Sequence, residues 1–102
     1  MLLTLVKGHV VSTAKVGSLS GKKLLLVEIV VAGLDGLKST GRNMVCIDAV
    51  GAGEGELVLT VMGSSARLTP GMGDVPADAV IVGIVDTLQF SGHILPLKEQ
   101  TV

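Results

Sequence analysis

The stretch that decides the fold is Lys23-Leu24-Leu25-Leu26-Val27-Glu28-Ile29-Val30-Val31-Ala32. Leucine and β-branched side chains suit the pleated surface of a β-strand. Apolar residues at nearly every position indicate a strand that is buried on most of both faces. Glu28 interrupts the run, and the uncharged pieces beside it are far shorter than the ~20 residues of a membrane-spanning helix. The stretch therefore predicts a buried strand.

Four further apolar runs predict strands in the same way, at Leu2 to Ser12, Met44 to Val50, Glu56 to Gly63 and Asp78 to Leu88. A turn at Gly17 to Lys22 would join the first run to residues 23–32 as a hairpin, and Gly8 would permit a bend or bulge. The polar, glycine-containing stretch Gly33 to Asn43 is predicted to be a loop. Five strands predict an all-β fold, a small five-stranded barrel, because closing the sheet removes its exposed edges.

The rest of the chain predicts little regular structure. Ser64 to Leu68 is predicted to form one short helical turn, and Thr69 to Ala77, which contains prolines and glycines, a connection. We expect the barrel to occupy residues 1–90. Residues 91–102 are partly apolar and are predicted to form a C-terminal tail or an edge strand that packs on a neighbouring subunit.

The composition argues against several classes of ligand. The chain has 102 residues, enough for one domain, with a formal net charge of −1 and a single aromatic residue, Phe90. A nearly neutral protein has no positive field to collect nucleic acid, and one aromatic ring cannot form a stacking platform for bases or sugars. A mean hydropathy of +0.69 on such a small, nearly neutral domain instead favours self-association.

Cysteine and histidine are too sparse for a structural zinc site, since the chain contains only Cys46, His9 and His93. The beginning of the sequence does not show the apolar core of a signal peptide, because Lys7 and Gly8 interrupt it. We therefore expect a cytoplasmic protein that binds no metal, no cofactor and no membrane.

The glycine-rich segment between two predicted strands is Gly51-Ala52-Gly53-Glu54-Gly55-Glu56. Spaced glycines could cradle a phosphate, but phosphate loops precede a helix and often carry a lysine, whereas this segment carries two carboxylates and precedes a strand. The alternative is a tight turn that needs positive φ angles or close backbone approach. The same small residues would suit a loop packed around a symmetry axis.

A serine nucleophile is a second candidate, in Gly63-Ser64-Ser65-Ala66-Arg67. The nucleophile elbow needs a second glycine where Arg67 stands, and no acid is evidently placed to orient either histidine as a general base. The alternative is a helix start with Ser64 or Ser65 as its N-cap and Arg67 bound to carbonyls or a carboxylate.

Three aspartates at the ends of apolar runs, Asp48, Asp78 and Asp86, could form a metal cluster. Aspartates at strand ends more often accept hydrogen bonds from the amides of turns. We favour this second interpretation.

Three segments together resemble one known family. They are Gly8-His9-Val10-Val11-Ser12-Thr13-Ala14-Lys15 with Gly21-Lys22-Lys23-Leu24-Leu25-Leu26-Val27; Asp48-Ala49-Val50-Gly51-Ala52-Gly53-Glu54-Gly55-Glu56 with Gly63-Ser64-Ser65-Ala66-Arg67; and Asp78-Ala79-Val80-Ile81-Val82-Gly83-Ile84-Val85-Asp86. In this order and spacing they resemble the EutN/CcmL family of bacterial microcompartment vertex proteins, over residues 1 to about 90.

The resemblance implies a five-stranded barrel similar to an OB-fold, assembled as a cyclic homopentamer. The pentamer would cap the fivefold vertices of a polyhedral shell whose facets are hexameric shell proteins. By resemblance, Gly51 to Glu56 would lie at the pentamer axis or interface, and Ser64, Ser65 and Arg67 at contacts between subunits or with the shell. Position 54 is usually a small or β-branched residue in the family, whereas this chain has Glu54.

The similarity to propanediol-type members at Ser12-Thr13 and Gly21 to Val27 favours a catabolic organelle over a carboxysome. The resemblance implies a structural protein and no enzyme. The runner-up interpretation is an OB-like module that binds a small ligand or nucleic acid.

Overall fold

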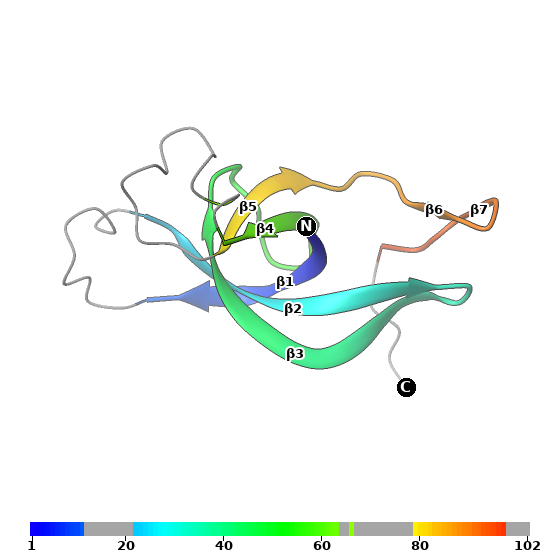
Figure 1. Ribbon diagram of the computed structural model, residues 1–102, viewed down its shortest axis with the longest axis horizontal. Helices are drawn as coiled ribbons and strands as arrows, with labels where there is room; N and C mark the ends of the chain where they lie inside the picture. The colour runs from blue at the N-terminus through cyan, green and yellow to red at the C-terminus, as the bar shows by residue number, and fades with distance from the viewer. Residues whose placement is uncertain (12–21, 64–65, 67–78, 98–102) are drawn as a thin grey trace.

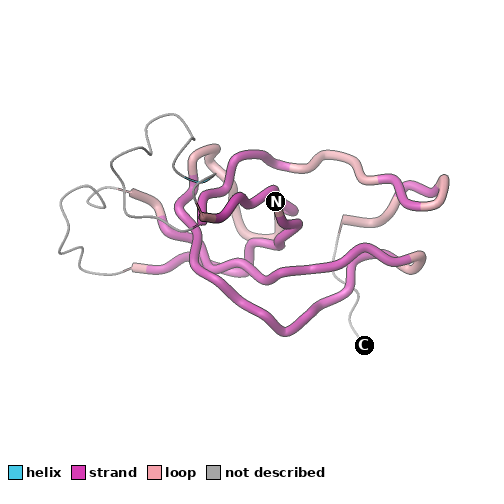
Figure 2. The backbone as a smooth tube through the Cα atoms, in the orientation of Figure 1, coloured by secondary structure: helices cyan, strands magenta, loops and turns pink. Residues whose placement is uncertain are grey.

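The computed structural model describes residues 1–11, 22–63, 66 and 79–97 (Figures 1 and 2). The elements with bounds within these ranges are β-strands, and the single residue Ala66 is helical. The strands are β1 (Leu2–Val10), β2 (Leu24–Gly33), β3 (Gly36–Asp48), β4 (Leu57–Met62), β5 (Ala79–Ile84), β6 (Gln89–Phe90) and β7 (His93–Ile94). The predicted helical turn, apart from Ala66, and the predicted connection 69–77 lie outside the described residues, as does the turn 17–22 apart from Lys22.

The first five strands form a closed barrel in the order β1-β2-β3-β5-β4, which confirms the predicted all-β, five-stranded barrel. Neighbouring strands are antiparallel except β3 and β5, which are parallel. The parallel pair is short, with Ile47 opposite Val80 and Asp48 opposite Ile81. This contact converts an open sheet into a barrel.

Gly8 lies at an irregularity in β1, as its sequence position predicted. Val6 pairs with Val27 of β2, but the next paired residue of β1 is Gly8, which lies opposite Leu26. Lys7 is therefore the extra residue of a β-bulge, which bends and twists the strand.

The predicted loop Gly33 to Asn43 is wrong, because most of it belongs to the longest strand. β2 continues to Gly33, residues 34–35 form the turn, and β3 begins at Gly36, whose φ of 116° suits a glycine. The side chains of residues 38–43 are all exposed. Residues 36–39 pair with β2 on an arm that extends beyond the barrel (Figure 1), and residues 40–43 lie at the base of this arm. Because the side chains of residues 38–43 are not buried, the segment lacks the apolar pattern by which a strand is recognised.

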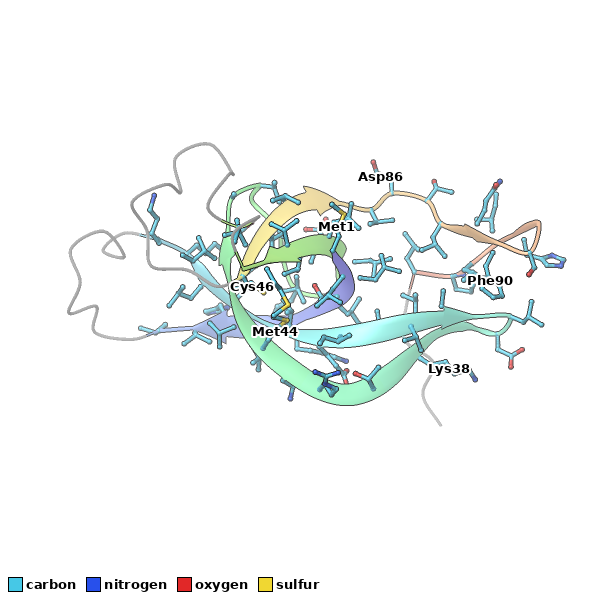
Figure 3. All side chains as sticks on the ribbon, viewed as in Figure 1. Met1, Lys38, Met44, Cys46, Asp86 and Phe90 are labelled. Atoms are coloured by element: carbon cyan, nitrogen blue, oxygen red, sulfur yellow. The ribbon has the colours of Figure 1, made fainter. Side chains whose placement is uncertain are left out.

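The barrel interior is filled by one buried cluster that draws on all five strands. Its members are Val6, Leu25, Val27, Cys46, Ala52, Val58, Ala79 and Ile81. Figure 3 shows Cys46 beside Met44, which packs against this cluster. Burial raises the pKa of the Cys46 thiol, which keeps the side chain protonated and unreactive.

Two polar side chains are fully buried in the same barrel. The hydroxyls of Thr4 and Thr60 lie 2.9 Å apart and share a hydrogen bond. The Cys46 thiol donates weakly to Thr60 Oγ1 at 4.0 Å. This pairing offsets the cost of burying hydroxyl groups.

A second core lies between the arm and the residues that follow β5. Leu5, Val30, Leu37 and Leu57 are buried there, and Val85, Leu88 and Leu97 pack against them. β6 and β7 form a small hairpin, after which the Leu95 amide donates to the Leu88 carbonyl at 2.9 Å. Residues 91–97 of the tail thus contact their own chain, and packing on a neighbour remains a prediction.

Truncating Leu37 tests whether this second core holds the arm. Leu37 is 0% exposed, so Leu37→Ala should lower the free energy of unfolding by about 2–5 kcal/mol through lost burial and a residual cavity. Lys38→Ala is the matched control, because its exposed ion pair with Asp35 contributes about 0–1 kcal/mol. Urea denaturation at equal protein concentration compares them, and equal losses would contradict the assignment.

Candidate functional site

The glycine-rich loop at residues 51–56 is held by the side chain of Asp48. Asp48 Oδ1 accepts hydrogen bonds from the amides of Val50 and Gly51, each at 3.0 Å, and Oδ2 accepts one from the Ala52 amide at 2.9 Å. Its side chain is 1% exposed. This confirms for Asp48 the interpretation that a strand-end aspartate binds turn amides.

Lys23, immediately before β2, completes this anchor. Its ammonium donates to the Ala52 carbonyl at 2.8 Å and lies 3.6 Å from Asp48 Oδ2. The two residues are also joined through the backbone, since the Asp48 amide donates to the Lys23 carbonyl at 2.9 Å. Apart from the position of this lysine beside an apolar run, nothing in the sequence indicated this role.

The other end of the loop is held by one hydrogen bond within the loop and by two to β1. Glu56 Oε1 accepts from the Gly53 amide at 2.7 Å. The Gly55 amide donates to the Val6 carbonyl at 2.8 Å, and the Val6 amide donates to the Glu56 carbonyl at 3.0 Å. Ala52, between the two anchors, is fully buried in the barrel cluster. The loop therefore closes one end of the barrel.

The geometry of the 51–56 loop favours the interpretation as a tight turn and argues against a phosphate-binding loop. Gly51 and Gly55 have φ angles of 80° and 85°, which L-residues with a side chain rarely adopt. No atom lies within 4 Å of the position that a Cβ would take, so it is the backbone conformation, and not lack of space, that requires glycine there. The amides of Gly51, Ala52 and Gly53 are already bound by the carboxylates of Asp48 and Glu56. A phosphate would find these donors occupied and two anions beside them.

Glu54 is the exposed member of the loop. Its side chain and that of His9 are each 65% exposed, with His9 Nδ1 3.9 Å from Glu54 Oε1. The contact becomes an ion pair only when the imidazole is protonated. Glu54 is thus free to interact with molecules outside its own subunit.

The remaining predicted site residues divide between exposed positions and positions outside the described residues. Ser64, Ser65 and Arg67 are outside, as is Asp78, while Ala66 between them is fully buried. Asp86 is exposed and points away from the barrel (Figure 3), and His93 is exposed on β7. Within the described ranges, no three His, Cys, Asp or Glu residues are grouped so that they could hold a metal ion.

Glu28 is a second carboxylate with several partners. In the sequence it stood out only as the single charge within an apolar strand. It is 7% exposed and lies 3.4 Å from Lys7 Nζ. The Ser39 hydroxyl, the Gly41 amide and Lys7 together lower the pKa of its carboxyl against the opposing effect of burial. It lies outside the 51–56 loop and forms a separate cluster.

Comparison with known proteins places the whole barrel in one family. The family described as "Ethanolamine utilisation protein EutN/carboxysome" matches residues 1–86. The chain is 47% identical to the microcompartment shell vertex protein GrpN of Rhodospirillum rubrum, covering 87% of this chain and 97% of the relative. It is 52% identical to the shell vertex protein PduN of Salmonella typhimurium, over 86% and 98% of the two chains.

Solved structures agree with the sequence comparison. CcmL of Gloeobacter violaceus superposes with a TM-score of 0.83 at 38% identity, covering 94% of this chain and 96% of that chain. The pentameric microcompartment shell protein GrpN of Rhodospirillum rubrum superposes with a TM-score of 0.75 at 47% identity, over 88% and 99%. Within the described part of the chain, no helix is long and apolar enough to cross a membrane.

Replacing Asp48 tests the loop anchor. Asp48→Ala removes the acceptor of three amide hydrogen bonds and the partner of Lys23, and should lower the free energy of unfolding by about 1–3 kcal/mol. Asp86→Ala removes an exposed carboxylate and should change it by less than about 0.5 kcal/mol. Chemical denaturation followed by circular dichroism measures both, and an Asp48→Ala protein as stable as the Asp86→Ala control would show that the anchor is unimportant.

Proposed function

The chain belongs to the EutN/CcmL family, and we propose that it is a shell vertex protein of a bacterial microcompartment that assembles as a homopentamer. One observation carries this proposal. The match to relatives named as shell vertex proteins extends over nearly the full length of both chains, and a relative of the same fold is described as pentameric. The protein would act in the cytoplasm, within the shell.

The surface of the subunit supports self-assembly. Several large apolar side chains on different strands and turns remain at least 46% exposed, namely Val31, Leu34, Val45, Met62 and Ile94. A net charge of −1 offers little repulsion between copies. Association would remove part of this apolar surface from water.

Hexameric shell proteins are the partners that a vertex protein requires. A flat sheet of hexamers cannot close into a polyhedron unless fivefold positions interrupt it. A head-to-tail interface between copies closes into a ring only when its rotation divides the full circle. We propose that a ring of five copies fills such a position, and that Ser64, Ser65 and Arg67 contribute to contacts between subunits or with the shell.

The compartment is proposed to be a catabolic organelle of the propanediol or ethanolamine type. The chain is 52% identical to PduN and 39% identical to EutN of Salmonella typhimurium. Relatives named as carboxysome vertex proteins are also similar, at 48% identity for CcmL of Synechocystis. The propanediol-type residues at 12–13 and 21–27 favour the catabolic assignment.

A structural role without catalysis fits the chemistry of the loop. The carboxylates of Asp48 and Glu56 are bound to backbone amides, which makes them poor general bases, and the carboxylate of Glu54 lies on the exposed surface. The runner-up function, an OB-like module for nucleic acid or a small ligand, would have to rely on Phe90 as its one aromatic ring. Salt-dependent retention on single-stranded DNA would support that alternative.

The oligomeric state tests the proposed function directly. Native mass spectrometry or light scattering at micromolar concentration should report five copies of the chain. A stable monomer would contradict the assembly, and a hexamer would be compatible with the family while excluding the vertex position.

Glu54→Gln tests whether the 51–56 loop lies near the fivefold axis. Five exposed carboxylates ~10 Å apart in water would repel by about 0.4 kcal/mol per pair, and salt would screen part of this. The variant pentamer should therefore be equally or more stable than the wild type, as judged from its dissociation on dilution at pH 7. Asp35→Asn, the same charge change on another exposed loop, is the control.

A weaker Glu54→Gln pentamer at neutral pH would contradict the acidic ring. It would show instead that Glu54 makes an attractive contact with a neighbouring subunit.

A further inference from the structure

Glu28 lies at the point where β2 leaves the barrel. β1 pairs with β2 only as far as Ile29, which lies opposite Thr4. From Val30 onwards β2 is paired with β3 alone, as far as Gly33 opposite Gly36. Residues 30–39 thus form a two-stranded arm, and Glu28 occupies its base.

β3 carries a bulge at the same level. Ile29 pairs with Arg42 and Val30 pairs with Ser39, so Thr40 and Gly41 are extra residues without a partner on β2. Gly41 has a φ of 74°, which glycine adopts without strain. Bulges bend a strand and increase its local twist, and Figures 1 and 2 show β3 curving between the barrel and the arm.

The Glu28 carboxylate binds both sides of this bulge. Its Oε2 accepts hydrogen bonds from the Ser39 hydroxyl and from the Gly41 amide, the latter at 3.0 Å. Its Oε1 lies 3.4 Å from Nζ of Lys7, the bulged residue of β1. The Glu28 side chain of β2 therefore connects the bulge of β1 with the bulge of β3.

The environment of this carboxylate favours its ionised form. Its side chain is 9% exposed, and an ionised group in such a place is stable only when it is well paired. Among the described contacts Lys7 supplies the positive charge from β1, and β3 supplies the neutral Ser39 and Gly41. Leu5, which lies opposite Glu28 on β1, belongs to a cluster whose members, including Leu97 of the tail, are all apolar.

We propose that Glu28 is the positioning residue of the arm: its carboxylate fixes the bend in β3 and hence the direction in which residues 30–39 leave the barrel. The arm carries Val31 and Leu34, which are 52% and 67% exposed, and would present them in a fixed direction. This inference concerns the single subunit and holds whatever the number of copies in the assembly.

Amide hydrogen exchange of the assembled protein at pH 7 tests the proposal. In Glu28→Gln one terminal oxygen becomes a donor that faces other donors, so the bulge loses a charge-assisted bond. Exchange in residues 30–39 should accelerate about ten- to hundredfold, while the paired amides of β1 and β4 change by less than about threefold. Ser39→Ala removes one donor and should accelerate the same residues to a smaller extent.

Asp35→Asn is the matched control, because it makes the same charge change on the same arm at an exposed residue. It should leave exchange in the arm unchanged. Equal acceleration throughout the barrel in Glu28→Gln would overturn the proposal, since it would show a general structural role. Unchanged exchange in the arm would overturn it as well.

The wild type provides a second test if Glu28→Gln does not fold. Because the pKa of Glu28 is lowered in the folded protein, its stabilising effect is complete above the ordinary glutamate pKa of about 4.3 and is lost as the pH falls through the folded value. Exchange in the arm, corrected for its intrinsic pH dependence, should then accelerate before exchange in β1 and β4. Simultaneous acceleration of all strands would contradict the proposal.

Discussion

The barrel depends on the short parallel contact between β3 and β5. Only two residue pairs form this contact, Ile47 with Val80 and Asp48 with Ile81, extended by a hydrogen bond from the Ala49 amide to the Ile81 carbonyl at 3.3 Å. A parallel pair of this length is weak by itself. Asp48 strengthens it, because its backbone belongs to the closing pair while its side chain holds the following loop and places Ala52 in the core. Closure of the sheet and order of the loop are thereby coupled.

The same geometry explains why β3 has two different surroundings along its length. Near Asp48 the strand lies between β2 and β5, whereas from residue 36 to residue 46 it is paired with β2 alone. The bulge at residues 40–41, with its left-handed Gly41 and the buried Glu28 carboxylate, lies farther along the strand, where β2 loses its pairing with β1. Beyond the bulge, the arm is supported on its inner side by Leu37 and the apolar residues that follow β5. Exposed polar side chains on the rest of the arm reduce the risk that its open edge pairs indiscriminately.

These features fit a protein whose function is assembly. The polar groups of the 51–56 loop are largely satisfied within the chain, which makes the loop a rigid surface feature and leaves few donors for a ligand. Apolar side chains on several strands and turns remain exposed and can be buried only against another molecule. A small closed barrel with a firmly held 51–56 loop and a projecting arm is well suited to form repeated contacts in a ring.

The sequence by itself determined the fold class, the strand count of the barrel, the bulge at Gly8 and the turn at 51–56, because apolar runs and glycines report burial and backbone conformation locally. The family was also evident from motifs spread over residues 8–86. The tertiary structure alone decided that residues 36–43 form a strand. Their polar sequence does not predict one, and the strand forms because β2 provides the partner for its backbone hydrogen bonds. It also decided the roles of Lys23 and Glu28. Each binds atoms far from it in the chain, and such contacts depend on which strands folding brings together.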